Sequence, residues 1–175
     1  MTAVKIIGIC MIITSSVLIG VAYGEKARNK IKLLESLMRL VIRLRGEVNY
    51  SVPVLSEIFE DISGYTGDIW SEYFLEMSGR ISAPDYPENE DIMWGQVAAG
   101  LHIDRMLYEE DYNDFIRFGR ELEGYDKESL VKRIDMYIGI LDNRIATLNK
   151  DIGNRVRICR MLGITGGAFL TILIV

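Results

Sequence analysis

The residue types that most often do chemistry in proteins are sparse in this sequence. It contains one histidine, His102, between Leu101 and Ile103, and a lone histidine beside apolar neighbours is more often a packing residue than a catalyst. The two cysteines, Cys10 and Cys159, lie in or beside apolar segments far apart in the chain and form no metal-binding or disulfide pattern. We therefore expect these three side chains to have packing roles.

Acidic residues are adjacent at one point of the sequence. Glu109, Glu110 and Asp111 are consecutive, but three neighbouring side chains on a helix point in different directions and make a poor cage for a divalent cation. The sequence contains no phosphate-binding glycine loop, no nucleophile elbow and no zinc-protease motif. It therefore predicts no catalytic residue, no cofactor-binding residue and no metal site.

Two uncharged apolar runs lie at the two ends of the sequence. Residues 6–24 would span about 28 Å as a helix, which is close to the hydrocarbon thickness of a bilayer. Residues 161–175 would span only about 22 Å, so their length leaves open whether they cross fully. We expect an N-terminal transmembrane helix over 5–24, a helical domain over 25–160 and a C-terminal membrane segment over 161–175.

Positive charge flanks both apolar runs on the side of the central domain. Lys26 and Arg28 follow the first run, and Arg157 and Arg160 precede the second. Because basic residues favour the cytoplasmic side of a membrane, we expect the domain to face the cytoplasm. The alternative is a cleaved signal peptide ending at 22–24, which the single lysine before the run and the basic residues after it disfavour.

Each apolar run also contains two glycines four residues apart. These pairs are Gly20 with Gly24 and Gly163 with Gly167. Small residues at this spacing allow the backbones of membrane helices to approach closely, although glycine is common in such helices and the indication is weak. We expect these glycines to pack against another helix of the same chain, a second copy or another protein.

The domain carries its negative charge in the middle of its sequence. The net charge is +4 over residues 25–53, −14 over 54–126 and +4 over 127–160. Basic residues near anionic headgroups gain about 1 kcal/mol each, while acidic residues are repelled. We therefore expect the acidic part to face a soluble partner, with ordinary solvation of surface helices as the alternative. Nucleic acid is disfavoured as a partner.

Apolar residues recur at helical spacing throughout the domain, which predicts an all-α fold. The expected helices cover 25–50, 54–62, 68–80, 88–98, 110–122, and 127 onwards into the second apolar run. Pro53 should end the first of these, Ser51 should cap the next, and Asp126 should cap the last. We expect the first helix to continue the apolar run as one rod. The two long terminal helices should pair as an antiparallel stem that carries four shorter helices.

Four short motifs occur in a fixed order along the chain. They consist of Glu47, Tyr50 and Pro53; Leu107, Glu110 and Asp111; Phe118, Gly119, Leu122 and Asp126; and Arg157, Arg160, Leu162 and Gly163. Together with the two apolar runs, this layout resembles the stage III sporulation protein AB family of endospore-forming bacteria. Val54, the segment 123–125 and Leu130 depart from the family pattern.

The resemblance implies a component of the channel complex that joins the mother cell to the forespore. It also implies a membrane-anchored helical bundle similar to the cytoplasmic domains of type II secretion and type IV pilus platform proteins. By that analogy the protein is a non-catalytic scaffold, integral to the mother-cell membrane. Its partners would be a cytoplasmic sporulation ATPase, other channel-complex subunits and the membrane, with no nucleic acid and no small-molecule substrate.

The acidic charge and the resemblance together suggest a docking surface. We expect a basic face of the ATPase to bind the carboxylates of Glu57, Glu60, Asp61, Glu109, Glu110 and Asp111. One alternative is a membrane-anchored signalling or ligand-sensing helical module, which an apolar cavity would favour. Another is an enzyme regulated at the membrane, which a reproducible activity of residues 25–160 would establish.

Overall fold

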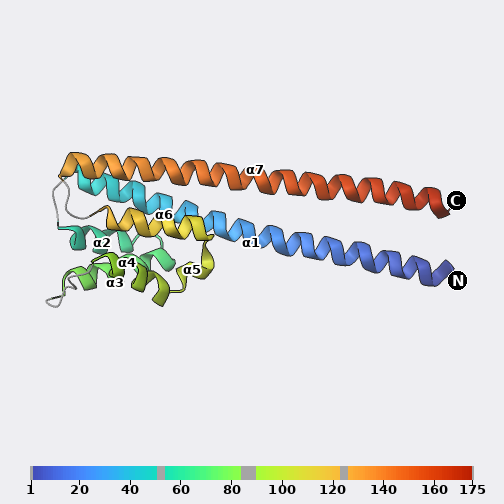
Figure 1. Ribbon diagram of the computed structural model, residues 1–175, viewed down its shortest axis with the longest axis horizontal. Coiled ribbons are helices and arrows are strands. Elements are labelled where there is room, and N and C mark those ends of the chain that lie inside the picture. The colour runs from blue at the N-terminus through green and yellow to red at the C-terminus, as the bar shows by residue number, and fades with distance from the viewer. Residues whose placement is uncertain (1, 51–53, 84–89, 123–125, 175) are drawn as a thin grey trace. The chain divides into compact units, whose positions relative to one another are not determined.

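The structure, a computed structural model, is built from α-helices. It describes the backbone of residues 2–50, 54–83, 90–122 and 126–174, and the side chains of 24–50, 54–83, 92–122, 126–154, 157, 158 and 161. Within these ranges every regular element is a helix (Figure 1), which confirms the predicted all-α class. The helices are α1 (Thr2–Tyr50), α2 (Leu55–Ser63), α3 (Ile69–Ile81), α4 (Glu90–Gly100), α5 (Ile103–Met106), α6 (Glu109–Arg120) and α7 (Lys127–Ile174).

The chain divides into two compact units. The terminal unit comprises Met1–Ile31 and Ile145–Val175, which are the N-terminal part of α1 and the C-terminal part of α7. Ala27 and Ile31 are buried in it, as is Ile145. The bundle unit comprises Lys32–Arg144 and contains α2 to α6 with the adjoining parts of α1 and α7.

Helix α1 runs without a break from Thr2 to Tyr50, so the apolar run and the first helix of the domain are one helix, as predicted. In the bundle unit it buries a broad apolar stripe made of Leu34, Leu37, Leu40, Val41, Leu44 and Val48. These residues recur at three-, four- and seven-residue spacing, which places them on one side of a helix. The width of the stripe allows α1 to contact more than one neighbour.

Helices α1 and α7 are antiparallel within the bundle unit. The Arg45 guanidinium forms an ion pair with the Asp135 carboxylate, and the Lys127 ammonium donates a hydrogen bond of 2.6 Å to the backbone oxygen of Asn49. Residues later in α1 therefore meet residues earlier in α7. The inward side of α7 is apolar and includes Ile134, Tyr137 and Leu141. This confirms, for the bundle unit, the predicted pairing of the two long helices.

Six large aromatic or apolar side chains from α2, α3, α4 and α6 form the centre of the bundle unit. They are Phe59, Trp70, Tyr73, Phe74, Trp94 and Phe115, all at most 1% exposed. Their polar atoms bond to the backbone where they can: Trp70 Nε1 donates to Leu33 O at 2.8 Å, and the Tyr73 hydroxyl donates to Trp94 O at 3.2 Å. Both tryptophans of the sequence therefore belong to the core of the bundle unit.

Two of the helix starts that the structure describes follow a local sequence signal, an aspartate at the N-cap. Gly67, with φ +63°, ends the turn after α2, and Asp68 then caps α3 by accepting a hydrogen bond of 3.1 Å from the Trp70 amide. Asp126 caps α7 in the same way through the Ser129 amide at 3.1 Å, as predicted. Ser51 and Pro53, the predicted cap and break before α2, lie outside the described residues.

Helices α4 and α6 pack closely where α6 has a glycine. A Cβ atom built on Gly119 would lie 2.2 Å from Cε3 of Trp94, which is far inside van der Waals contact. Trp94 is itself 1% exposed and lies edge-on against Phe59, with ring centroids 5.7 Å apart. Gly119 therefore allows α6 to pack directly against the face of the indole.

The connection between α4 and α6 differs from the sequence-based expectation. The short helix α5 was not predicted, so the described residues between α1 and α7 form five short helices instead of four. His102, predicted to be a packing residue, is exposed and adopts the left-handed conformation with φ 57° and ψ 27°. The chain turns sharply after Gly100, which puts Ile103 into the core and turns His102 towards solvent.

The predicted membrane segments are covered only in small part by the described side chains. Within those residues, no helix is both long enough and apolar enough to cross a bilayer. The structure does not describe the surroundings of five predicted packing residues in or next to these segments: Cys10, Cys159, Gly20, Gly163 and Gly167. Gly24 is described, and a Cβ atom there would meet nothing within 4 Å.

Candidate functional site

One face of α2 presents acidic side chains to solvent. At about 100° per residue, residues 57, 60 and 61 share one side of the helix. The carboxylates on this side are those of Glu57, Glu60 and Asp61, and all three residues are exposed. The opposite side of α2 packs into the core through Ile58, Phe59 and Ile62, each at most 2% exposed. We call Glu57, Glu60 and Asp61 the acidic face.

The acidic face carries unbalanced charge. Among the side chains that the structure describes, the ion pairs involve other residues, and none includes Glu57, Glu60 or Asp61. Glu57 lies in the first turn of α2, where a negative charge interacts favourably with the helix dipole. The face thus combines three close negative charges with a rigid, buried support.

The second predicted acidic set, at the start of α6, is divided by the structure. Asp111 is 6% exposed, and its Oδ1 accepts a hydrogen bond of 2.6 Å from Arg144 Nε. Burial raises the pKa of the Asp111 carboxyl, although the Arg144 guanidinium acts in the opposite direction. Glu110 also lies 3.2 Å from Arg144, but its side chain is 81% exposed. Glu109 is exposed and takes part in no ion pair between described side chains.

Asp111 therefore connects α6 to α7 inside the bundle unit and is not available at the surface. Glu109 and Glu110 remain exposed candidates for docking in addition to the acidic face, but Asp111 does not, because it is buried. A signal for this difference exists in the sequence, because residues 111, 115 and 118 recur at helical spacing. Phe115 and Phe118 are both buried, so Asp111 lies on the inward side of α6.

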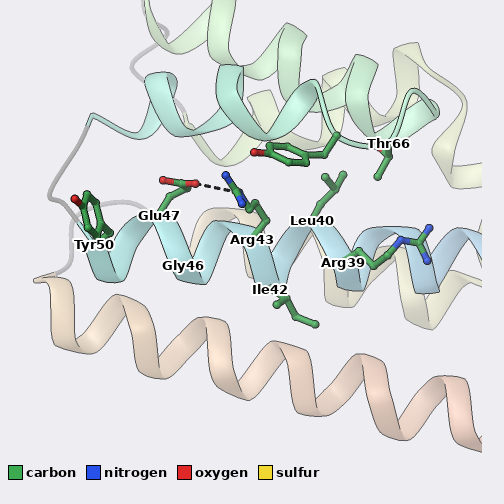
Figure 2. A pocket seen from close by; sticks show the side chains of 9 residues that line it. Arg39, Leu40, Ile42, Arg43, Gly46, Glu47, Tyr50 and Thr66 are labelled. Carbon is green, nitrogen blue, oxygen red and sulfur yellow. Dashed lines mark ion pairs between the residues drawn. The ribbon is translucent and has the colours of Figure 1, made fainter.

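A groove that was not predicted lies beside α1 in the bundle unit (Figure 2). It has a volume of about 590 Å³ and is lined by Arg39, Leu40, Ile42, Arg43, Gly46, Glu47 and Tyr50 of α1, with Tyr65 and Thr66 from the turn after α2. We call it the α1 groove. Figure 2 shows Arg43 reaching towards Glu47, with a distance of 3.0 Å between Nε and Oε1. The sequence signal that could have indicated this groove is the spacing of Arg39, Arg43 and Tyr50, which places them on one side of α1.

The described side chains form no recognisable centre for covalent or metal chemistry. Within them, no group of three or more His, Cys, Asp or Glu residues could hold a metal ion. The charged groups of the bundle unit instead form helix-to-helix ion pairs, as in Arg144 with Asp111, or surfaces open to solvent, as in the acidic face. The arrangement is suited to binding other proteins.

Comparisons with known proteins agree with this fold. A solved structure titled stage III sporulation protein AB superposes with a TM-score of 0.62 and 18% identity, covering 71% of this chain and 97% of that chain. At this identity the likeness concerns the fold alone. No curated protein sequence matches the chain. The family model described as stage III sporulation protein AB matches residues 5–175, which confirms the resemblance seen in the motifs. The chain therefore belongs to the stage III sporulation protein AB family.

Proposed function

We propose that this protein is a non-catalytic platform subunit of the sporulation channel complex at the mother-cell membrane, and that it docks a cytoplasmic ATPase. Membership of the family supports a role in stage III of sporulation. The observation that carries the docking proposal is the acidic face of α2, whose three carboxylates are exposed and unpaired among the described residues. A basic surface on the ATPase is the complementary partner.

The support beneath the acidic face makes it suitable for docking. Phe59 lies directly between the acidic residues in sequence and packs against Phe74 at 5.1 Å and Trp94 at 5.7 Å between ring centroids. Aromatic pairs of this kind fix both side chains and add to the stability of the core. A rigid surface loses little conformational entropy on binding, so its charges contribute fully to recognition.

The electrostatic argument also sets the expected size of the effect. Exposed charges at the edge of an interface contribute about 0.2–1 kcal/mol each and act mainly on the association rate. Loss of three such contributions should thus weaken binding by roughly 3- to 150-fold, since every 1.4 kcal/mol changes the affinity tenfold. The effect should shrink as salt screens the charges.

The experiment compares the full chain with a triple variant, Glu57→Lys, Glu60→Lys and Asp61→Lys. Binding to the purified ATPase is measured at low and high salt, and spore yield is measured in cells that carry each version. Glu72→Lys is the matched control, because Glu72 is an exposed acid in the first turn of α3. We expect the triple variant to lose ATPase binding and spore yield, while the control keeps both. Unchanged binding and yield in the triple variant would refute the docking proposal.

The ligand-sensing alternative calls for a different observation. A sensor of a small apolar molecule needs an enclosed apolar cavity with few polar groups. The α1 groove instead exposes two arginines, a glutamate and two tyrosines. This lining favours recognition of a protein surface, so we place the platform function first.

A further inference from the structure

The α1 groove gathers the residue types that contribute most to binding at protein interfaces. Arg39, Arg43, Gly46 and Tyr50 follow one another at three- or four-residue spacing and therefore share one side of α1. Tyr50 is 91% exposed, and Tyr65 is 57% exposed. Single exposed aromatic residues are ordinary, but arginine and tyrosine around one concavity are typical of interface hot spots.

The groove is organised before any partner binds. The Arg43 guanidinium lies 4.3 Å from the centroid of the Tyr65 ring, which joins α1 to the turn after α2. The same guanidinium also forms an ion pair with Glu47, with 3.0 Å between Nε and Oε1. Between these side chains the floor is open, because a Cβ atom on Gly46 would meet nothing within 4 Å. A partner that enters the groove therefore meets an Arg43 side chain that is already held by Tyr65 and Glu47.

The charge of the groove selects an acidic partner. Glu47 balances only one of its two arginines, Arg43. Arg39 is exposed, and no ion pair between described side chains includes it. The groove thus has a net positive charge beside exposed tyrosines, and its complement is a helix surface with several carboxylates.

The chain itself carries such a surface next to the groove. Helix α2 ends at Ser63, and Tyr65 of the groove follows two residues later, so a single short turn connects the helix of the acidic face to the groove. With α2 only about 13 Å long, both surfaces lie within one small area. A two-fold axis through that area would place the acidic face of each copy against the groove of the other, making two identical contacts at once.

We infer that two copies of this protein associate through reciprocal contacts between the acidic face of α2 and the α1 groove. This inference rests on the proposed function in one respect: self-association and ATPase docking would use the same carboxylates of α2. The two associations therefore compete, and a self-associated pair has its ATPase-docking surface covered. Release of the pair exposes the acidic face for the ATPase.

The test uses charge exchange in the full chain, purified in a mild detergent, with light scattering to measure the protein mass of each particle. The groove variant is Arg39→Glu, and the face variant carries Glu57→Arg, Glu60→Arg and Asp61→Arg. We expect the unchanged chain to have twice the monomer mass at low salt and each variant alone to have the monomer mass. An equal mixture of the two variants should regain the doubled mass, because both reciprocal contacts again join opposite charges.

Two further variants separate shape from charge. Gly46→Phe fills the groove without altering charge and should also give the monomer mass. Lys32→Glu is the matched control for Arg39→Glu, because it reverses an exposed basic residue of α1 that does not line the groove. It should keep the doubled mass, and circular dichroism should show the same helix content in every variant.

The outcomes separate this inference from the docking proposal. A wild-type chain that stays monomeric refutes self-association, as does a doubled mass that survives both Arg39→Glu and Gly46→Phe. Arg39→Glu should keep or strengthen ATPase binding, because the acidic face remains and is no longer covered by a second copy. If the face variant loses self-association but binds the ATPase as before, the ATPase docking is wrong and the paired arrangement stands.

Discussion

Replacing Gly119 by alanine tests the closest helix contact of the bundle unit. The added methyl group would lie 2.2, 2.5 and 2.8 Å from three ring atoms of Trp94. Carbon atoms pack at about 3.5–4.0 Å, so α6 or the indole must move by more than about 1 Å. Trp94 has little freedom to move, because Phe59 lies edge-on against it and Tyr73 donates a hydrogen bond to its backbone oxygen.

The expected loss of stability follows from two opposing effects. Overpacking a close-packed core costs about 1–3 kcal/mol. Alanine also favours a helix over glycine by about 0.5–1 kcal/mol, which offsets part of that cost. The net destabilisation should be about 1–2 kcal/mol, and with a urea dependence of about 1–3 kcal/mol per molar this lowers the unfolding midpoint by roughly 0.3–2 M.

Tryptophan fluorescence during urea unfolding of the full chain measures this change. Both tryptophans of the sequence, Trp70 and Trp94, lie in the core of the bundle unit, so the signal reports on that unit. Gly139→Ala is the matched control, because Gly139 is an exposed helical glycine with nothing within 4 Å of an added Cβ atom. Its midpoint should rise. If the Gly119 and Gly139 variants both rise by similar amounts, α6 does not pack on Trp94 as described.

Three other substitutions have defined expected effects in the same assay. Arg144→Met should destabilise the bundle unit by about 3–5 kcal/mol by leaving the Asp111 carboxylate buried without its cation, and adding Asp111→Asn should recover much of the loss. Asp68→Asn should remove part of the pH dependence of the free energy of unfolding. Burial raises the pKa of the Asp68 carboxyl, but hydrogen bonds from Ser36, Thr66 and backbone amides outweigh this effect and lower the pKa. Because the folded-state pKa is below the unfolded value, the wild-type chain loses this stabilisation as the pH falls through the folded pKa, and the variant should show a smaller loss over that range. Tyr137→Phe should change stability by less than about 0.5 kcal/mol or increase it, because the buried hydroxyl has no hydrogen-bond partner among the described atoms; a loss above about 2 kcal/mol would show that the hydroxyl is bonded.

The fold was predictable where apolar spacing and capping residues agree. The stripe of α1, the capping by Asp126 and the burial of both tryptophans all follow from local pattern. Helix α5 was not predictable in the same way, because four residues are too few for a periodic pattern and the preceding turn depends on His102 in a left-handed conformation. That conformation is uncommon for residues other than glycine, although histidine adopts it more often than most, and here it accompanies the burial of Ile103.

The candidate site was predictable only in part. Three acids at one-sided spacing on a short amphipathic helix indicated an exposed face, and α2 has that arrangement. The three consecutive acids at the start of α6 did not indicate a common exposed face, because adjacent residues of a helix point in different directions. The spacing of residues 111, 115 and 118 indicates the inward side of α6, but the partner of Asp111, Arg144, lies 33 positions away and is not indicated by local pattern. The α1 groove likewise depends on Tyr65, which reaches Arg43 only through the tertiary fold.

The hydrogen bond from Lys127 to Asn49 has a consequence for how this protein tolerates change. It joins the last turn of α1 to the first residue of α7. The end of α1 and the start of α7 therefore lie close together, although the sequence of all the short helices lies between them. The short helices are thus an insertion between the arms of a helical hairpin. Because the hairpin is held by its own contacts, including Arg45 with Asp135, the inserted helices can change in length or number without altering the register of the arms.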